Sequence, residues 1–130
     1  MSVMSYIEFN NNPVGRRTGD CSVRAISKAL DLGWEAAHLM LDVNAIGMGD
    51  MPSSDLVLGA TLRQNGFYKH LMNSYMTVED FCDIYPSGVY VLFCGGHVVT
   101  VIDGDIYDSY DSGKEVVQYY WSKEDKHVEY

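Results

Sequence analysis

Two short motifs place a cysteine and a histidine where they could work as nucleophile and base. Cys21 lies in the segment Gly19–Arg24 (GDCSVR), where the pattern predicts the start of a helix. His97 follows a glycine pair and precedes the apolar stretch Val98–Ile102. A thiol becomes a strong nucleophile when its pKa is lowered, and a helix N-terminus and a nearby imidazole both lower it. The pairing predicts thiol-dependent attack on an acyl group.

Each of these residues also has a plainer interpretation. A free cysteine in the first turn of a helix is most often a small buried apolar residue, and a histidine at a strand start is most often satisfied by a backbone carbonyl. Cys82, beside Phe81, and Cys94, in a strand-like run, are interpreted as core residues. The other histidines have no comparable setting and are expected at the surface: His38, His70 and His127.

A third group is needed to orient the imidazole, and aspartates follow His97 in the sequence. Asp103 and Asp105 fall in a predicted turn, too close to the strand end to reach back. A symmetrical turn centred on Gly104 would place Asp111 opposite the histidine, and a tighter turn moves the partner toward Asp108. Hairpin geometry alone leaves both residues open.

The elements that must position these groups divide into helices first and strands second. Apolar residues recur at helical spacing after Asp20, which suits an N-cap, and Gly33 is the expected stop. Three more helices are predicted, over Trp34–Val43, Ser54–Asn65 and from Thr77, where Asp80 resembles a capping-box partner. The segment Gly47–Ser53 is expected to be a flexible loop over a cleft.

Strand-like segments dominate the C-terminal part of the chain. They cover Val89–Phe93, His97–Ile102, Ile106–Tyr110 and Val116–Trp121, and Tyr6–Phe9 is expected to be an edge strand or an extended arm. Helices followed by an antiparallel sheet are typical of the α+β class. We expect a single domain over residues 1–130, with no linker and no repeat.

Composition excludes several classes of function. The formal charge of −9 and a pI near 4.6 disfavour nonspecific binding to nucleic acid or to an anionic membrane. No apolar run approaches the ~20 residues that span a bilayer, and the first residues carry no signal-peptide pattern. Three cysteines without a tight pair indicate free thiols, so a reducing cytoplasm is the expected location.

Two metal-site interpretations are weaker than the Cys-His one. Cys94 and His97 have C-x-x-H spacing, but no second ligand pair follows at zinc-finger spacing. The aspartates between Asp103 and Asp111 lack the glycine and the terminal glutamate of a calcium loop. We expect no metal and no organic cofactor.

With these motifs the chain resembles the papain-like cysteine peptidases. Asp20-Cys21 before a helix, His97 on a strand and Asp108-Ser109-Tyr110 on the next are similar to the small members of that superfamily, the bacteriocin-leader (C39-type) peptidases and the NlpC/P60 amidases. The Gly15–Cys21 segment is closest to small papain-fold proteins of phages and prophages. The likeness covers about Asn10 to Trp121. It implies an α+β, papain-like fold, with N-terminal helices packed on a small C-terminal antiparallel sheet.

The resemblance also implies roles for individual residues. The orienting residue of these enzymes is followed by a small and then an aromatic residue, which matches Asp108 and not Asp111. The family places a glutamine for the oxyanion six positions before the cysteine, where this chain has Gly15. Asn12 is the expected substitute, together with the backbone amide of Cys21. Asp20 is grouped with Asn12 as an oxyanion or substrate-binding residue.

The expected function is hydrolysis of an amide, peptide or isopeptide bond in a protein or peptide substrate, through a Cys21–His97–Asp108 triad. Deamidation and transamidation use the same chemistry. The alternative is a non-catalytic acidic interaction or inhibitor protein of phage origin, of the anti-defence type, that keeps the fold. A peptidoglycan amidase is the other enzymatic option. Mutation of Cys21 separates enzyme from inhibitor, because an inhibitor would keep its effect.

Overall fold

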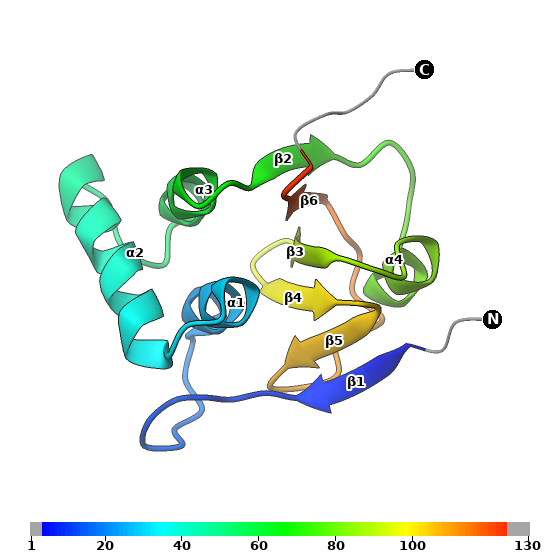
Figure 1. Cartoon of the computed structure of the whole chain (residues 1–130), viewed down its shortest axis with the longest axis horizontal. Helices are drawn as coiled ribbons and strands as arrows, with labels where there is room; N and C mark the ends of the chain where they lie inside the picture. The colour runs from blue at the N-terminus through cyan, green and yellow to red at the C-terminus, as the bar shows by residue number, and fades with distance from the viewer. Residues whose placement is uncertain (1–3, 125–130) are drawn as a thin grey trace.

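The computed structural model describes residues 4–124, so His127 lies outside the described residues. Four helices surround a six-stranded sheet (Figure 1). The helices are α1 (Cys21–Leu30), α2 (Trp34–Met48), α3 (Asp55–Gln64) and α4 (Val78–Ile84). The strands are β1 (Ser5–Glu8), β2 (Tyr68–Leu71), β3 (Val89–Phe93), β4 (Val98–Ile102), β5 (Asp105–Asp108) and β6 (Tyr119–Ser122).

The sheet is mixed, and it is not confined to the C-terminal part of the chain. Its strand order is β1-β5-β4-β3-β6-β2. β1 pairs in parallel with β5, whereas the other neighbours are antiparallel. The α+β class is therefore correct, but the expectation of a C-terminal antiparallel sheet is wrong. β1 comes from the N-terminus and β2 lies between α3 and α4, and both add to the sheet as edge strands.

The helix and strand ends show where sequence signals were sufficient. Thr77 and Asp80 form the predicted capping box at the start of α4. The second helix extends past Val43 to Met48, because Gly47 continues the helix and Gly49 ends it with φ 66°. The predicted flexible loop is therefore shorter than Gly47–Ser53. The fourth predicted strand begins at Tyr119, since Val116 makes only an isolated bridge with Thr77.

The sheet separates two apolar clusters. α1, α2 and α3 lie on one side and α4 on the other (Figure 1). Ile26, Leu41 and Trp121 belong to the first cluster, and Phe81, Val99 and Ile106 to the second. Ala25 on α1 accepts a hydrogen bond through its backbone oxygen from Thr100 Oγ1 on β4, at 2.8 Å. This buried bond fixes α1 across the middle of the sheet.

Two tight turns set the positions of His97 and Asp108. Gly95 and Gly96 connect β3 to β4 with φ angles of 72° and 87°, which glycine adopts without strain. Asp103 and Gly104 connect β4 to β5 with φ angles of 51° and 81°. Both are two-residue hairpin turns of the kind that follows the twist of the sheet.

No helix within residues 4–124 is long and apolar enough to span a bilayer.

Candidate active site

Cys21 is the first residue of α1, so its thiol lies at the positive end of the helix. The first backbone bond of the helix runs from Arg24 N to Asp20 O, at 2.9 Å. The N–H groups of Cys21, Ser22 and Val23 come before that bond and have no partner within the helix. Asp20 occupies the N-cap position but makes no side-chain capping bond. The helix start therefore keeps its donors available to an anion.

His97 contacts both the thiol and a carboxylate. Its Nε2 lies 2.6 Å from Asp108 Oδ2, and its ring also forms a hydrogen bond with the Cys21 side chain. Because Asp108 occupies Nε2, the bond to Cys21 falls to Nδ1. The backbone N–H of Val98, the next residue, also donates to the Cys21 sulfur. The turn through Gly95-Gly96 places both groups beside the helix start.

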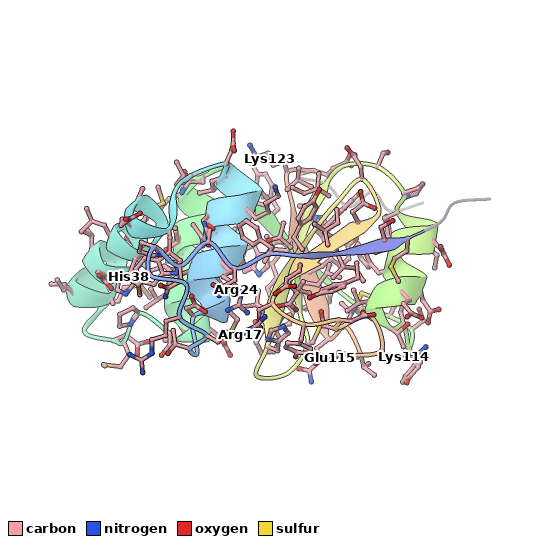
Figure 2. The ribbon with its side chains drawn as sticks, turned by 90° about the horizontal axis from the view of Figure 1, so that it is seen from below. Arg17, Arg24, His38, Lys114, Glu115 and Lys123 are labelled. Carbon is pink, nitrogen blue, oxygen red and sulfur yellow. The ribbon has the colours of Figure 1, made fainter. Side chains whose placement is uncertain are left out.

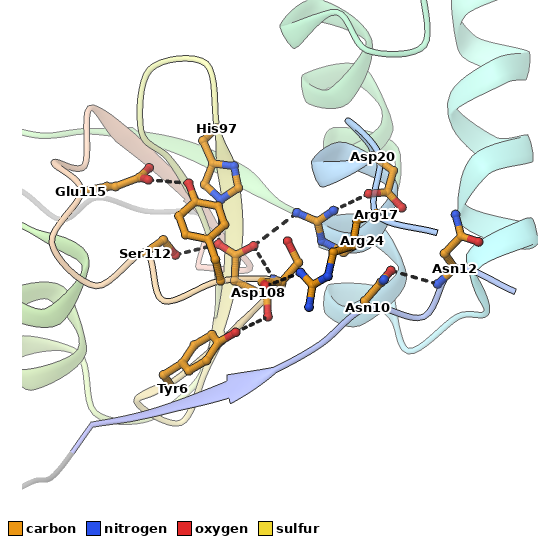
Figure 3. Close-up of polar contacts among 12 residues, drawn as sticks. Tyr6, Asn10, Asn12, Arg17, Asp20, Arg24, His97, Asp108, Ser112 and Glu115 are labelled. Carbon is orange, nitrogen blue, oxygen red and sulfur yellow. Dashed lines mark hydrogen bonds and ion pairs between the residues drawn. The ribbon is translucent and has the colours of Figure 1, made fainter. Parts of the chain in front are cut away.

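Asp108, and not Asp111, is the carboxylate that contacts the histidine (Figure 3). Its Oδ2 also accepts from Ser112 Oγ at 2.6 Å, and its Oδ1 accepts from the backbone N–H of Ser109 at 2.7 Å. Asp111 instead accepts from the Gly113 N–H at 3.0 Å. β5 ends at Asp108, two residues earlier than predicted, so Asp111 follows the strand.

The hairpin register differs from both alternatives that the sequence left open. Thr100 pairs with Tyr107, and continuing that register places Tyr110 opposite His97. The two rings are neighbours, with centroids 5.0 Å apart. Asp108 therefore reaches the histidine diagonally, from two positions earlier on the neighbouring strand.

A buried arginine connects Asp108 to the N-cap. Arg24 lies on α1 at the boundary between the helices and the sheet (Figure 2). Its Nη2 is 3.2 Å from Asp108 Oδ1, and its Nη1 forms an ion pair with Asp20. Trp34 on α2 completes the chain, because its Nε1 donates to Asp20 Oδ2 at 2.9 Å. All three charged side chains are buried, so each charge depends on its partners.

These contacts shift the pKa value of each of the three groups in the direction that favours its charged form. Burial favours the neutral thiol of Cys21, but its hydrogen bonds from His97 and Val98 and the nearby positive charges outweigh burial and lower its pKa. Burial also opposes the imidazolium, yet the bonds to Asp108 and Cys21 raise the pKa of His97 to about 9. Asp108 likewise has a lowered pKa, since its hydrogen bonds outweigh its burial. The site favours a thiolate–imidazolium pair.

Asp20 contacts side chains of α1 and α2. Its Oδ1 pairs with Arg24 and its Oδ2 accepts from Trp34, and the side chain is buried. A carboxylate has no proton to donate to an oxyanion. Asp20 holds Arg24 and Trp34 in place. Asp20 also lines the groove described below, so its part in substrate binding stays a prediction.

Asn12 lies in the wall of a groove and not against the thiol. Its Oδ1 accepts from the Val14 N–H at 2.9 Å, which closes a turn in the loop before α1. The groove, of about 540 Å³, is lined by this loop, by Asp20 and Ser22, by Trp34 and His38 on α2, and by Pro52 and Ser53. In Figure 3, Asn12 and His97 lie on opposite sides of Arg24.

The remaining cysteines and histidines lie in other settings. Cys82 is buried on α4, in agreement with its interpretation as a core residue, and burial raises its pKa to about 12. Cys94 is only half-buried, in the turn beside the site, and burial together with Glu115 and Asp108 raises its pKa to about 12. His38 lies 2.7 Å from Asp42, and His70 stacks on Tyr120. Across residues 4–124 no cluster of His, Cys, Asp and Glu is suited to a metal ion.

Sequence reasoning missed Arg24, Trp34 and Ser112. A signal for Arg24 was present, because it is four residues after Asp20 and falls on the apolar face of α1 with Val23 and Ser27, where a charge needs a buried partner. Ser112 and Trp34 carried no such signal. Ser112 is four residues from Asp108, but no helix or strand joins the two, and Trp34 reaches Asp20 from the next helix.

Comparisons with known proteins add no relative: no family model, no curated protein and no solved structure matches this chain. The assignment of a function therefore depends on the geometry of the site.

Proposed function

We propose that this protein is a thiol-dependent hydrolase of amide, peptide or isopeptide bonds, with a papain-like arrangement of Cys21, His97 and Asp108. One observation carries the proposal. A cysteine at a helix start is hydrogen-bonded to an imidazole whose other nitrogen lies 2.6 Å from a buried carboxylate. Nucleophile, base and orienting group in that order are what acyl transfer requires.

In the first half of the reaction, Cys21 Sγ attacks the carbonyl carbon of the substrate and the carbonyl electron pair moves to oxygen. The imidazolium of His97 gives its Nδ1 proton to the amine nitrogen as the C–N bond breaks. The acyl group remains on sulfur as a thioester. In the second half, His97 takes a proton from water, the hydroxyl attacks the thioester, and the thiolate leaves with the imidazolium restored. Asp108 stays ionised and holds the ring throughout.

The developing oxyanion needs donors, and the uncapped start of α1 supplies them. In most helices an N-cap side chain accepts from these first N–H groups. Here the Asp20 carboxylate is held by Arg24 and Trp34, so the N–H groups of Ser22 and Val23 stay uncapped. The Cys21 amide, which precedes the first helical bond, is open to a substrate oxygen as well. This role does not need the side-chain glutamine that the chain lacks at Gly15.

The groove beside Asp20 and Ser22 gives a substrate a place to lie. Its walls are largely apolar, with Val23, Trp34 and Pro52 among the lining residues. Trp34 cannot turn freely, because its indole is bonded to Asp20 and its ring lies 4.9 Å from that of His38. We assign to this groove a substrate segment on one side of the cleaved bond.

The decisive experiment is labelling of the purified protein with peptidyl electrophiles, followed by mass-spectrometric mapping, in parallel with release of fluorophore from a library of peptide amides. We expect modification at Cys21 and turnover that both Cys21→Ala and His97→Ala abolish. Cys82→Ala is the matched control and should keep labelling and turnover. Preferential labelling of Cys94 or Cys82, or turnover that survives Cys21→Ala, would contradict the proposal.

The net charge of −9 favours the non-catalytic alternative, in which the acidic surface binds and blocks a basic partner. Under that alternative, Cys21→Ala keeps the full biological effect of the wild type. Under the hydrolase proposal the same variant loses it.

A further inference from the structure

Ser112 is a buried serine in the loop that follows β5, and only 1% of its surface is exposed. Its hydroxyl donates to Asp108 Oδ2 at 2.6 Å, and the same oxygen lies 2.6 Å from His97 Nε2. The other carboxylate oxygen, Oδ1, accepts from the backbone N–H of Ser109 and contacts Arg24. One carboxylate oxygen therefore serves the hydroxyl and the imidazole at once.

Arg24 and Ser112 hold the Asp108 carboxylate from opposite sides. In Figure 3, Ser112 lies to one side of Asp108 and Arg24 to the other, with His97 above. The guanidinium attracts the carboxylate by its charge, and burial strengthens that attraction. Their contact is 3.2 Å long, whereas a fully formed bond between such charges measures about 2.7–2.9 Å. The carboxylate can therefore turn further toward Arg24, and the bond from Ser112 opposes that turn.

The position of Ser112 is fixed because its loop is bonded to the start of α4. The N–H groups of Val78 and Glu79, the first two residues of α4, donate to Glu115 O and Gly113 O, both at 2.9 Å. N–H groups at a helix start have no partner within the helix, so the loop satisfies them. Loop and helix also approach closely, since a Cβ atom on Gly113 would lie 2.8 Å from Glu79 Cγ. Ser112 is thus anchored by an element that supplies no residue of the proposed triad.

We propose that Ser112 is a positioning residue, whose hydroxyl keeps the Asp108 carboxylate facing His97 against the attraction of Arg24. The role rests on the proposed function, because the group that Ser112 positions is the carboxylate of the proposed triad. Two helices on opposite sides of the sheet then determine where that carboxylate lies. α1 acts on it through Arg24, and α4 acts on it through the loop that carries Ser112.

A hydroxyl that merely satisfies its own hydrogen bond would have the opposite effect on His97. Such a hydroxyl competes with the imidazolium for Asp108 Oδ2, so its removal would strengthen the remaining bond and raise the pKa of His97. Removal of a positioning hydroxyl instead lets the carboxylate turn toward Arg24. The bond to His97 then weakens, and the pKa of His97 falls. The direction of the shift separates the two roles.

The test is an NMR titration of the histidine ring nitrogens in the full chain labelled with ¹⁵N-histidine, with the His97 signals assigned by their loss in His97→Gln. The wild type should titrate at a pKa of about 9. Ser112→Ala should titrate at a lower pKa, and so should Ser112→Cys, because a thiol is a weak donor. Ser112→Thr keeps the hydroxyl and should restore the wild-type value. Where a substrate is found, Ser112→Ala should lower kcat about tenfold with KM unchanged, because a displaced imidazole affects the transition state and not binding.

Ser109→Ala is the matched control. Ser109 lies in the same loop and contacts Asp108 through its backbone N–H, which alanine keeps, so this variant should titrate like the wild type. Circular dichroism melts check that each variant is folded.

The titration needs no turnover, so a protein that hydrolyses none of the peptide amides would refute the proposed function without affecting this measurement. An unchanged or raised pKa of His97 in folded Ser112→Ala overturns the positioning role, and so does an equal fall in Ser109→Ala. A folded Ser112→Thr variant that titrates like Ser112→Ala overturns it as well, because the hydroxyl is then not the group that matters.

Discussion

Arg24 and Asp108 are 84 positions apart in the sequence and form a buried ion pair, with Nη2 3.2 Å from Oδ1. The pair joins α1, which carries the thiol, to β5, which carries the carboxylate. The Arg24 guanidinium also forms an ion pair with Asp20, so one cation neutralises two buried carboxylates. The position of Asp108 against His97 therefore depends on a residue of α1 that is not a member of the proposed triad.

Arg24 is accordingly predicted to be a positioning residue. Arg24→Gln leaves two buried carboxylates without their cation, which we expect to cost about 3 kcal/mol of unfolding free energy. Loss of the positive charge also raises the pKa of Cys21, so alkylation at neutral pH should slow. The acid limb of the alkylation rate against pH then moves to higher pH.

Two controls separate this positioning effect from general destabilisation. Lys28→Gln removes a cation from the same helix that lies over the Tyr107 ring, and its alkylation profile should match the wild type. Arg24→Lys keeps the charge but not the fork that reaches both carboxylates, and should recover part of the acid-limb shift. If the acid limb of the alkylation profile does not move in Arg24→Gln, Arg24 only stabilises the fold and does not affect the ionisation of Cys21.

The alkylation rate of Cys21 should report its ionisation directly. Its pKa is lowered, so the iodoacetamide rate should rise at a midpoint below the ~8.5 of a free thiol. His97→Gln removes the imidazolium while burial remains, so the midpoint should move above that value. Cys82 and Cys94, with pKa values of about 12, should stay unreactive at neutral pH. Faster reaction at either of them would reverse the assignment of the nucleophile.

Turnover, where a substrate is found, should be bell-shaped in pH. The rising limb follows formation of the Cys21 thiolate. The falling limb lies near 9, where His97 loses the proton that the leaving group needs. These two midpoints belong to the coupled pair and not to either residue alone. Arg24→Lys and Lys28→Gln should keep the falling limb near 9, and uncatalysed hydrolysis of the same substrate should show no such limb. Those two results together would assign the limb to the active site.

Local patterns predicted those parts of the fold that local interactions determine. The capping box at Thr77, the strand Val89–Phe93 and the choice of a tight turn at Asp103-Gly104 depend on neighbouring residues, and the structure has them. β2 was missed because its sequence, Tyr68–Leu71, does not alternate apolar and polar residues. Its pairing with β6 joins segments that are far apart in the sequence. The parallel partner of β1 could not be read from its own four residues for the same reason.

The candidate site was predicted to the extent that residue type determined it. Cys21 and His97 stand out because few residue types can act as nucleophile and base, and Asp108 was selected by the family pattern. The contacts of Asp20 were not predicted, because an acidic residue before a helix ordinarily caps it with its side chain. Whether it does so depends on Arg24 and on Trp34, which arrives from another helix.

His97→Ala should change how stability depends on pH, with its largest cost at acid pH. The pKa of His97 is about 9 in the folded protein, above the ~6.5 of the unfolded chain. Its stabilising contribution is therefore complete below about 6.5 and is lost as the pH rises through 9. Asp108 keeps Arg24 and Ser112 as partners in the variant, so no buried charge is orphaned. Thermal melts should show wild type and variant converging toward pH 9–10. A gap in melting temperature that stays the same from pH 6 to pH 10 would contradict this argument.

Asp108→Asn and Asp111→Asn should have very different effects. The two Asp108 oxygens face donors on both sides, with His97 and Ser112 at Oδ2 and Arg24 at Oδ1. An asparagine has one oxygen, so its amide must face either the imidazole or the guanidinium, and one donor loses its acceptor. We expect a loss of about 2 kcal/mol or more in stability and a fall in the pKa of His97, because its charged partner is gone.

Asp111→Asn changes an exposed side chain that accepts only from Gly113 in its own turn, and an amide oxygen can replace it there. It should match the wild type in melting temperature and in Cys21 alkylation. Equal losses in the two variants, or a larger loss in Asp111→Asn, would mean that the carboxylate that orients His97 in solution is not Asp108.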